Sequence, residues 1–168
     1  SLGHEVGVTA LQLGMAYAAI ANGGFLMKPR LIKQIISSSG KTVYAEQPEV
    51  IRKVASKNVM DIMTDMLCRV VDTGTGTKAA INGWSVAGKT GTAQKYIDGR
   101  YSKKKFISNF VGFLPADNPQ LVGVIILDEP KIGYHWGGHG AAPVFKRVME
   151  RIINMDDSIP LLKPQTIK

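Results

Sequence analysis

The sequence predicts an α+β fold in which helices flank an antiparallel β-sheet. Apolar residues recur at helical spacing in three segments, and from residue 84 the spacing changes to that of strands. The strand-like segments are joined by turns too short to hold a crossover helix, so neighbouring strands are expected to run antiparallel. The 168 residues suit one compact domain or a large piece of one.

The first helix is expected over residues 9–22. Thr9 followed by Gln12 has the form of a capping box, and the helical pattern ends at Gly23-Gly24. The residues that follow at helical spacing are Leu11, Met15, Ala18, Ala19 and Asn22.

A hairpin and a second helix should follow. The runs 31–36 and 42–45 are β-prone and surround a serine-rich turn with a glycine. Ser56 can cap a helix that ends at residues 73–76. Its apolar positions should keep one face to a core, and they are Val59, Ile62, Met63, Met66, Leu67, Val70 and Val71.

Three strands are expected at 84–93, 106–114 and 121–127. Asp98-Gly99 and the Asp-Asn-Pro at 117–119 are typical turn sequences between them. The three strands should therefore form one antiparallel meander.

A last helix is expected over residues 141–153, packed on one face of the meander. Pro143 suits its first turn, and the tail 158–168, which contains two prolines, is expected to fray. The helix should bury one stripe, which consists of Val144, Phe145, Val148, Met149 and Ile152.

The charge and the cysteine content limit the function classes. The net charge is +8, but the only run of cations, Lys103–Lys105, follows the Asp98-Gly99 turn, which favours a solvated hairpin over a nucleic-acid surface. A single cysteine, Cys68, leaves no intramolecular disulfide. We therefore expect no nucleic-acid partner.

The histidines and the ends of the chain give little functional signal. His135 and His139 are four residues apart, but glycines on both sides predict a loop, so we expect no metal site and no cofactor. The sequence contains no apolar run of the ~20 residues that a membrane span needs. It begins without a signal peptide or an initiator methionine, so Ser1 is expected to be a cut site.

One alternative function is a phosphate-loop ATPase. Residues 83–90, GWSVAGKT, match the pattern G-x-x-x-x-G-K-[ST], and residues 124–130, VIILDEP, imitate an apolar strand that ends in magnesium-binding acids. Such a loop needs a buried strand before it and a helix after it. Residues 78–82 make a poor buried strand, and residues 91–99 show no helical stripe.

The other interpretation starts from Lys89-Thr90-Gly91-Thr92, placed on a strand. Lys-Thr-Gly is the third motif of the penicillin-recognising serine acyl-transferases, whose first two are Ser-x-x-Lys and Ser-x-Asn. A strand lysine brings positive charge to the cleft, a threonine hydroxyl can bind a carboxylate, and glycine leaves room for a substrate backbone.

Further blocks around this motif make the chain similar to class B penicillin-binding proteins over residues 1–153. The blocks occur in the family's order, and they are VTALQL…AYAAIANGG at 8–24, GTGT at 74–77, VAGKTGTAQ at 86–94, NFVGFLPADNP at 109–119 and GG…AAPVF at 137–145. The long spacer 95–108 resembles the cell-division members more than the elongation members. Ala10 and His135-Trp136 depart from the usual pattern, which bears on the subfamily and not on the chemistry.

This resemblance implies that residues 1–168 are the C-terminal portion of an incomplete transpeptidase domain with the fold of penicillin-binding proteins and serine β-lactamases. The parent is then expected to be a membrane-anchored, periplasmic D,D-transpeptidase that cross-links peptidoglycan stem peptides and is acylated by β-lactams. A cell-wall synthase is a possible partner. The first two motifs would precede Ser1, so the chain alone should be inactive.

The resemblance also implies roles for the motif residues. Lys89 would act electrostatically and in the proton network, and Thr90 and Thr92 would bind the substrate carboxylate beside Gly91. The backbone N–H of Thr92 would donate to the oxyanion.

Several other residues imitate catalytic groups. Asp128 and Glu129 are adjacent on a strand, so they should point to opposite faces, and we assign them no catalysis. Two serine segments, Ser38–Lys41 and Ser102–Lys105, mimic the first absent motif but offer no buried helical face. Ser56–Asn58 mimics the second motif, but helix capping explains this serine more simply.

Overall fold

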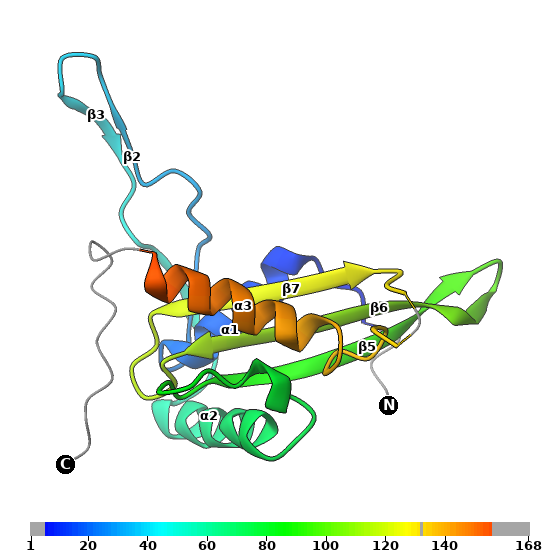
Figure 1. Cartoon of the computed structure of the whole chain (residues 1–168). Helices are drawn as coiled ribbons and strands as arrows, with labels where there is room; N and C mark the ends of the chain where they lie inside the picture. The colour runs from blue at the N-terminus through cyan, green and yellow to red at the C-terminus, as the bar shows by residue number, and fades with distance from the viewer. Residues whose placement is uncertain (1–5, 132, 156–168) are drawn as a thin grey trace, which may run out of the picture.

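The computed structural model describes residues 6–131 and 133–155, and its centre is a three-stranded antiparallel sheet with helices on both faces (Figure 1). The strand order is β5-β6-β7, with β5 at Ala87–Ile97, β6 at Arg100–Leu114 and β7 at Leu121–Asp128. Helix α3, Ala141–Asn154, covers one face, and helix α1, Ala10–Ala21, lies behind the other (Figure 1). The α+β prediction and the antiparallel meander are confirmed.

The ends of the strands differ from the predicted ones because of how the turns are built. Strand β5 begins at Ala87 and not at residue 84, since Trp84 pairs with Ile81 in a tight turn whose Gly83 has φ +79°. At the other end, Asp98 and Gly99 both have positive φ and form a two-residue turn, so β5 and β6 pair right up to this turn. The predicted spacer 95–108 is therefore mostly paired strand.

The sheet separates two apolar clusters. Alternate residues of β6 point to opposite faces, so Phe110 faces α3 and Phe113 faces α1. The ring of Phe110 lies 4.8 Å, centroid to centroid, from the ring of Phe145 on α3, and both side chains are fully buried. The cluster around Phe113 contains Leu67, Ala87 and Ala116 with the half-buried Tyr17, Ile20 and Cys68. Burial raises the pKa of the Tyr17 hydroxyl. The pKa of the Cys68 thiol is also raised, mainly by burial and to a lesser extent by nearby acidic residues.

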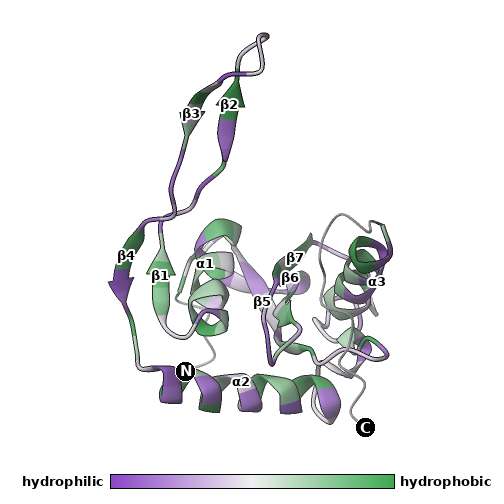
Figure 2. Cartoon of the chain, turned by 90° about the vertical axis from the view of Figure 1, so that its left-hand side faces the viewer, coloured by the Kyte–Doolittle hydropathy of each residue, from purple (hydrophilic) through white to green (hydrophobic). Residues whose placement is uncertain are grey.

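Helix α2, Lys57–Asp72, begins at the predicted cap, where Ser56 Oγ accepts a hydrogen bond from Val59 N–H. The prediction that its whole apolar stripe faces a core is wrong. Met60, Leu67 and Val71 are buried, whereas Val59, Ile62, Met63 and Met66 are exposed. Because α2 runs beside β5 and not across a sheet face, only its inner side has a partner (Figures 1 and 2).

The other two helices begin close to the predicted positions. Both capping-box hydrogen bonds of α1 form, from Thr9 N–H to Gln12 Oε1 at 2.9 Å and from Gln12 N–H to Thr9 Oγ1 at 3.2 Å. In α3 the predicted stripe is wrong at Val148, which is 40% exposed. Ala141 and Ala142 are buried instead, because their small side chains let the first turn lie close to the sheet.

Two small antiparallel pairs complete the fold. Strands β2, Gln34–Ile36, and β3, Thr42–Ala45, form the predicted hairpin, which projects away from the body (Figure 2). Strands β1, Phe25–Met27, and β4, Val50–Lys53, pair with each other and were not predicted. The predictions for Ser1 and for the tail 158–168 lie outside the described residues. In the described part of the chain, the helices are too short or too polar to cross a membrane.

Candidate functional site

The predicted Lys-Thr-Gly-Thr motif lies in the first half of β5, at the edge of the sheet. Within residues 6–131 and 133–155, β5 pairs with β6 alone, so its other edge carries unpaired backbone groups. An extended peptide can add to such an edge as a further strand. The register sets Lys89 opposite Val111 and Thr92 opposite Ser108.

The lysine and the threonine hydroxyl meet although strand alternation should separate them. Thr90 and Thr92 lie on the α3 side of the sheet, and Lys89 and Gly91 lie on the other. Lys89 Nζ nevertheless donates to the carbonyl oxygen of Thr90 at 2.8 Å and lies 3.5 Å from Thr90 Oγ1. The ammonium group has folded around the strand's free edge, where it remains exposed.

The same contact indicates which backbone groups face outward. A carbonyl that accepts from a side chain bent over the free edge points away from β6, and backbone direction repeats every second residue in an antiparallel strand. The N–H of Thr92 therefore shares the direction of the Thr90 carbonyl. The cation, both hydroxyls and this N–H lie within one short stretch of edge strand.

Thr75 is a site residue that the sequence analysis did not assign. Its Oγ1 lies 2.7 Å from Thr90 Oγ1, and it comes from the glycine-rich segment after α2. An ideal Cβ on Gly138 would lie 2.3 Å from the Thr75 carbonyl oxygen, so Gly138 packs directly on this threonine. The GTGT block at 74–77 could have indicated this residue, because glycines next to threonines allow another backbone segment to pack closely there.

A second glycine contact fixes Thr92. Its Oγ1 accepts a hydrogen bond of 3.0 Å from Gly137 N–H. A Cβ on Gly137 would lie 2.6 Å from the carbonyl oxygens of both Gly91 and Asn109, so only glycine fits here. Since one lone pair of the Thr92 hydroxyl is occupied, its proton remains available to an acceptor outside the strand.

Gly91 makes room for Asn109 of the neighbouring strand. A Cβ on Gly91 would lie 2.3 Å from Asn109 Oδ1. The glycine of the motif therefore has a packing reason in addition to the predicted room for a substrate.

An ion cluster ties the far half of β5 to the end of β7. Lys95 Nζ lies 2.9 Å from both Asp128 Oδ1 and Glu129 Oε1, and Lys105 Nζ lies 3.3 Å from Glu129 Oε2. The prediction that Asp128 and Glu129 point to opposite faces is wrong, because β7 ends at Asp128 and Glu129 turns back with φ +47°.

The cluster shifts the ionisation of its members. Hydrogen bonds from Lys95 and then Lys105 lower the pKa of Glu129 below its ordinary value. Hydrogen bonds to Glu129 and then Asp128 raise the pKa of Lys95. Both groups are therefore held in their charged forms.

The three imitating serines lie away from the motif. Ser56 caps α2, Ser38 lies in the β2–β3 turn, and Ser102 Oγ accepts from the backbone N–H groups of Lys104 and Lys105. The ring of His135 makes tilted contacts with the rings of Phe106 and Trp136, whose centroids are 4.8 and 5.0 Å away.

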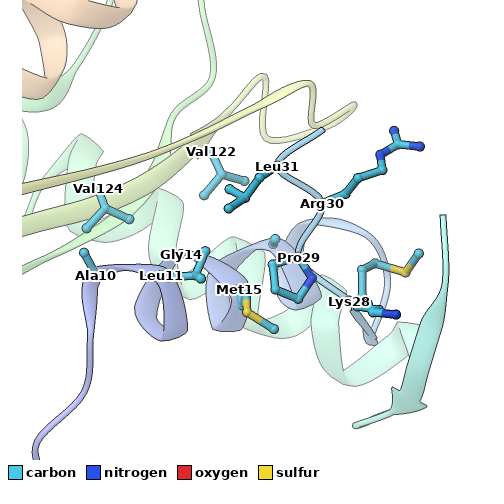
Figure 3. A pocket seen from close by; sticks show the side chains of 12 residues that line it. Ala10, Leu11, Gly14, Met15, Lys28, Pro29, Arg30, Leu31, Val122 and Val124 are labelled. Carbon is cyan, nitrogen blue, oxygen red and sulfur yellow. The ribbon is translucent and has the colours of Figure 1, made fainter. Parts of the chain in front are cut away.

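An apolar groove of about 400 Å³ lies elsewhere, between α1, β7 and the segment 27–31 (Figure 3). Gly14 and Met15 line it from α1, and Val122 and Val124 line it from β7. Since β7 is at the other edge of the sheet from β5, this groove is separate from Lys89 and the threonines.

The geometry contradicts the phosphate-loop alternative. Lys89 lies within a strand that continues to Ile97, so no helix N-terminus follows it. Strands β6 and β7 are antiparallel, whereas a nucleotide-binding sheet of that class needs parallel strands.

A helix-covered antiparallel sheet with Lys-Thr-Gly on its edge strand defines the class of penicillin-recognising serine acyl-transferases. The family profile described as "Penicillin binding protein transpeptidase domain" matches residues 1–150. The chain belongs to this family, and the predicted resemblance is confirmed.

Curated relatives agree with this assignment. The chain is 36% identical over 155 residues to "Probable peptidoglycan D,D-transpeptidase PenA" of Neisseria meningitidis, covering 92% of this chain and 25% of that protein. It is 39% identical to "Stage V sporulation protein D" of Bacillus subtilis, covering 96% of this chain and 24% of that protein. The chain thus spans about a quarter of the length of these two relatives.

Solved structures share the fold. The apo form of penicillin-binding protein 3 from Mycobacterium tuberculosis superposes with a TM-score of 0.81 at 34% identity, covering 96% of this chain and 38% of that one. The same protein complexed with ampicillin superposes with a TM-score of 0.77 at 32% identity, covering 98% and 40%.

Proposed function

We propose that this chain forms one wall of the active site of a peptidoglycan D,D-transpeptidase whose catalytic serine lies in a part of the parent protein that precedes Ser1. The observation that carries the proposal is the free edge of β5, where a lysine ammonium, two threonine hydroxyls and an outward-directed N–H gather. Acyl transfer to serine needs these elements opposite the nucleophile.

Lys89 supplies the positive charge of this wall. Its ammonium lies 2.8 Å from the Thr90 carbonyl oxygen, and we propose that the serine and lysine of a Ser-x-x-Lys motif approach the edge there. A cation there stabilises the anionic tetrahedral intermediate and assists proton transfer, and closing the cleft strengthens the effect by excluding water.

Thr90 and Thr92 bind the substrate carboxylate, and Thr92 N–H donates to the oxyanion. Thr75 acts as a positioning residue, because its hydroxyl, 2.7 Å from that of Thr90, selects the direction in which Thr90 donates. Gly137 does the same for Thr92 through its N–H.

The substrate of the parent is a peptide strand of peptidoglycan, laid along β5, and β-lactams react as its mimics. The relatives' names support this substrate class, and the ampicillin complex of a similar structure supports the β-lactam. We further propose that the parent is anchored in the cytoplasmic membrane with this domain on its outer side. We also propose that the parent acts at division and that its partner is a cell-wall synthase.

Acylation of the full-length parent by a fluorescent penicillin tests the proposal. The labelled peptide should carry a serine that begins a Ser-x-x-Lys sequence upstream of Ser1. A parent that takes up no label, or takes it up on a serine within residues 1–168, would contradict the proposed function.

A further inference from the structure

The tip of the β5–β6 hairpin carries a cationic hollow at the end of the strand that bears the motif. The hollow encloses about 500 Å³ and is lined from both sides of the Asp98-Gly99 turn. Its charged residues are Asp98, Arg100, Lys103, Lys104 and Lys105. Four basic residues and only one acidic residue therefore line the hollow.

The basic residues of the hairpin fall into two groups, one that forms ion pairs and one that does not. Lys95 and Lys105 are bound by Asp128 and Glu129 at the end of β7. Arg100, Lys103 and Lys104 are exposed and form no ion pair with any residue of 6–131 or 133–155. Like charges crowded on one hairpin repel each other, so this group is positioned to attract an anion.

The tip is shaped as well as charged. Tyr96 and Tyr101 face each other across the two strands with ring centroids 5.2 Å apart in an edge-to-face arrangement. This pair stiffens the hairpin near its turn. Figure 1 shows the tip extending beyond the end of β7, where it stands clear of the helices.

The direction of β5 connects the hollow with the site. The strand runs from Lys89 through Thr92 to Ile97, so the five residues after Thr92 lead about 17 Å toward the tip. If a peptide added to β5 antiparallel, with its carboxyl end at Thr90 and Thr92, its earlier residues would extend along β5 toward the tip.

We propose that the cationic hollow binds a carboxylate carried by the substrate peptide several residues before its reactive bond, and so selects acidic over amidated strands. This inference rests on the proposed function, which supplies the peptide on β5. The three free cations determine specificity and take no part in the acyl transfer.

The test uses the full-length parent and two synthetic acyl-donor peptides with the same D,D-dipeptide terminus. They differ only in a carboxylate or a carboxamide four residues before the reactive bond. The tip variant is Arg100→Gln, Lys103→Gln, Lys104→Gln. A matched control, Lys33→Gln, Lys41→Gln, Arg52→Gln, removes the same number and kind of charges from three exposed positions: just before β2, just before β3 and on β4.

The wild type should favour the carboxylate peptide by about fivefold to tenfold in KM with kcat unchanged, since exposed ion pairs are individually weak. The tip variant should lose this preference, and the control should keep it. Raising the ionic strength from about 0.1 M to about 1 M should also remove it, because the Debye length falls from about 10 to about 3 Å.

Equal KM values for the two peptides in the wild type, or a preference kept by the tip variant, would overturn the inference. So would tip-dependent sedimentation with vesicles that contain an anionic phospholipid, combined with no peptide preference, because it would assign the hollow to a membrane surface. Acylation by fluorescent penicillin separates the two proposals. If the wild type is acylated but shows no peptide preference, only this inference is contradicted. If the wild type is not acylated, the proposed function is contradicted as well.

Discussion

Lys89 and the two threonines reach the edge of β5 by different means. The threonine hydroxyls are held by contacts from other segments, Thr90 by Thr75 and Thr92 by Gly137. The ammonium of Lys89 is held by the carbonyl of its own neighbour, so its position depends on the strand alone. The lysine should therefore tolerate changes around it that the threonines do not.

Replacing Lys89 in the parent should impair the chemical step. Loss of one preorganised donor to a developing oxyanion costs about 3–4 kcal/mol, so Lys89→Ala should slow acylation by about a hundredfold to a thousandfold. Stability should hardly change, because the side chain is exposed. Lys89→Arg should rescue only part of the rate, since the planar guanidinium is larger. The second-order rate with a fluorescent penicillin measures this, and a Lys89→Ala rate within about threefold of wild type would make the lysine structural.

Thr75→Val should weaken binding without slowing chemistry. The hydroxyl orients Thr90, and a net hydrogen bond contributes about 0.5–1.5 kcal/mol, so pre-covalent penicillin binding should weaken by about threefold to tenfold. The limiting acylation rate should stay unchanged. Thr75→Ser keeps the hydroxyl and should restore binding. Stopped-flow kinetics separate the two constants, and a fall in the limiting rate with no rescue by serine would refute the positioning role.

Whole elements of the fold were predictable where their patterns are local. The cap at Thr9, the cap at Ser56 and the turn at Asp98-Gly99 each specify structure within four residues, and each prediction is confirmed. Strands β1 and β4 were missed, since they are three and four residues long and pair across a gap of more than twenty residues. Thr75 was missed for a related reason, because its partner lies fifteen residues away in sequence.

The ion cluster joins β5, β6 and β7 at one end. It was not predicted from the sequence, because the alternation of side chains holds only within a strand and β7 ends at Asp128. Asp128 is the last residue of β7, and the left-handed backbone of Glu129 returns its carboxylate to Lys95. The cluster holds the base of the cationic hairpin against the sheet.

The pH range of this cluster follows from its pKa shifts. Glu129 has a lowered pKa, so its contribution to stability is present above its ordinary value of 4.5 and is lost as the pH falls through the folded value. Lys95 has a raised pKa, so its contribution is present below its ordinary value of 10.5 and is lost as the pH rises through the folded value.

Lys95→Met should therefore return the Glu129 pKa toward its ordinary value, because the main donor to the carboxylate is removed. Carboxyl ¹³C NMR of labelled glutamate measures the midpoint. Lys146→Met on α3 removes a lysine that pairs with Glu150 and should leave the Glu129 midpoint unchanged. An unchanged midpoint in Lys95→Met would show that Lys105 alone sets the shift.

At the scale of the whole molecule, the described residues supply only one wall of the site. The edge of β5 supplies a cation and donors, while the serines Ser38, Ser56 and Ser102 lie in a turn, a helix cap and a strand of the hairpin. Helix α2 also leaves Val59, Ile62, Met63 and Met66 exposed, on the side turned away from its own sheet.

The isolated 168-residue chain should form no covalent adduct with penicillin. The edge of β5 supplies hydrogen-bond donors and a cation but no nucleophile that a penicillin could acylate. Intact-mass measurement after incubation with a labelled penicillin tests this, with far-ultraviolet circular dichroism to verify folding. A stoichiometric adduct on any serine of the chain would show that one of the three imitating segments is reactive.

The two-residue turn at Asp98-Gly99 has a consequence for folding kinetics. Every pair between β5 and β6, from Ile97 with Arg100 to Ala87 with Phe113, closes outward from this one turn. Each new contact extends a loop that is already closed, so little chain entropy is lost at any step. Hairpins of this kind form within about 1–10 μs. The motif strand can therefore find its register from its nearest neighbour in sequence, before the distant parts of the parent protein have folded against it.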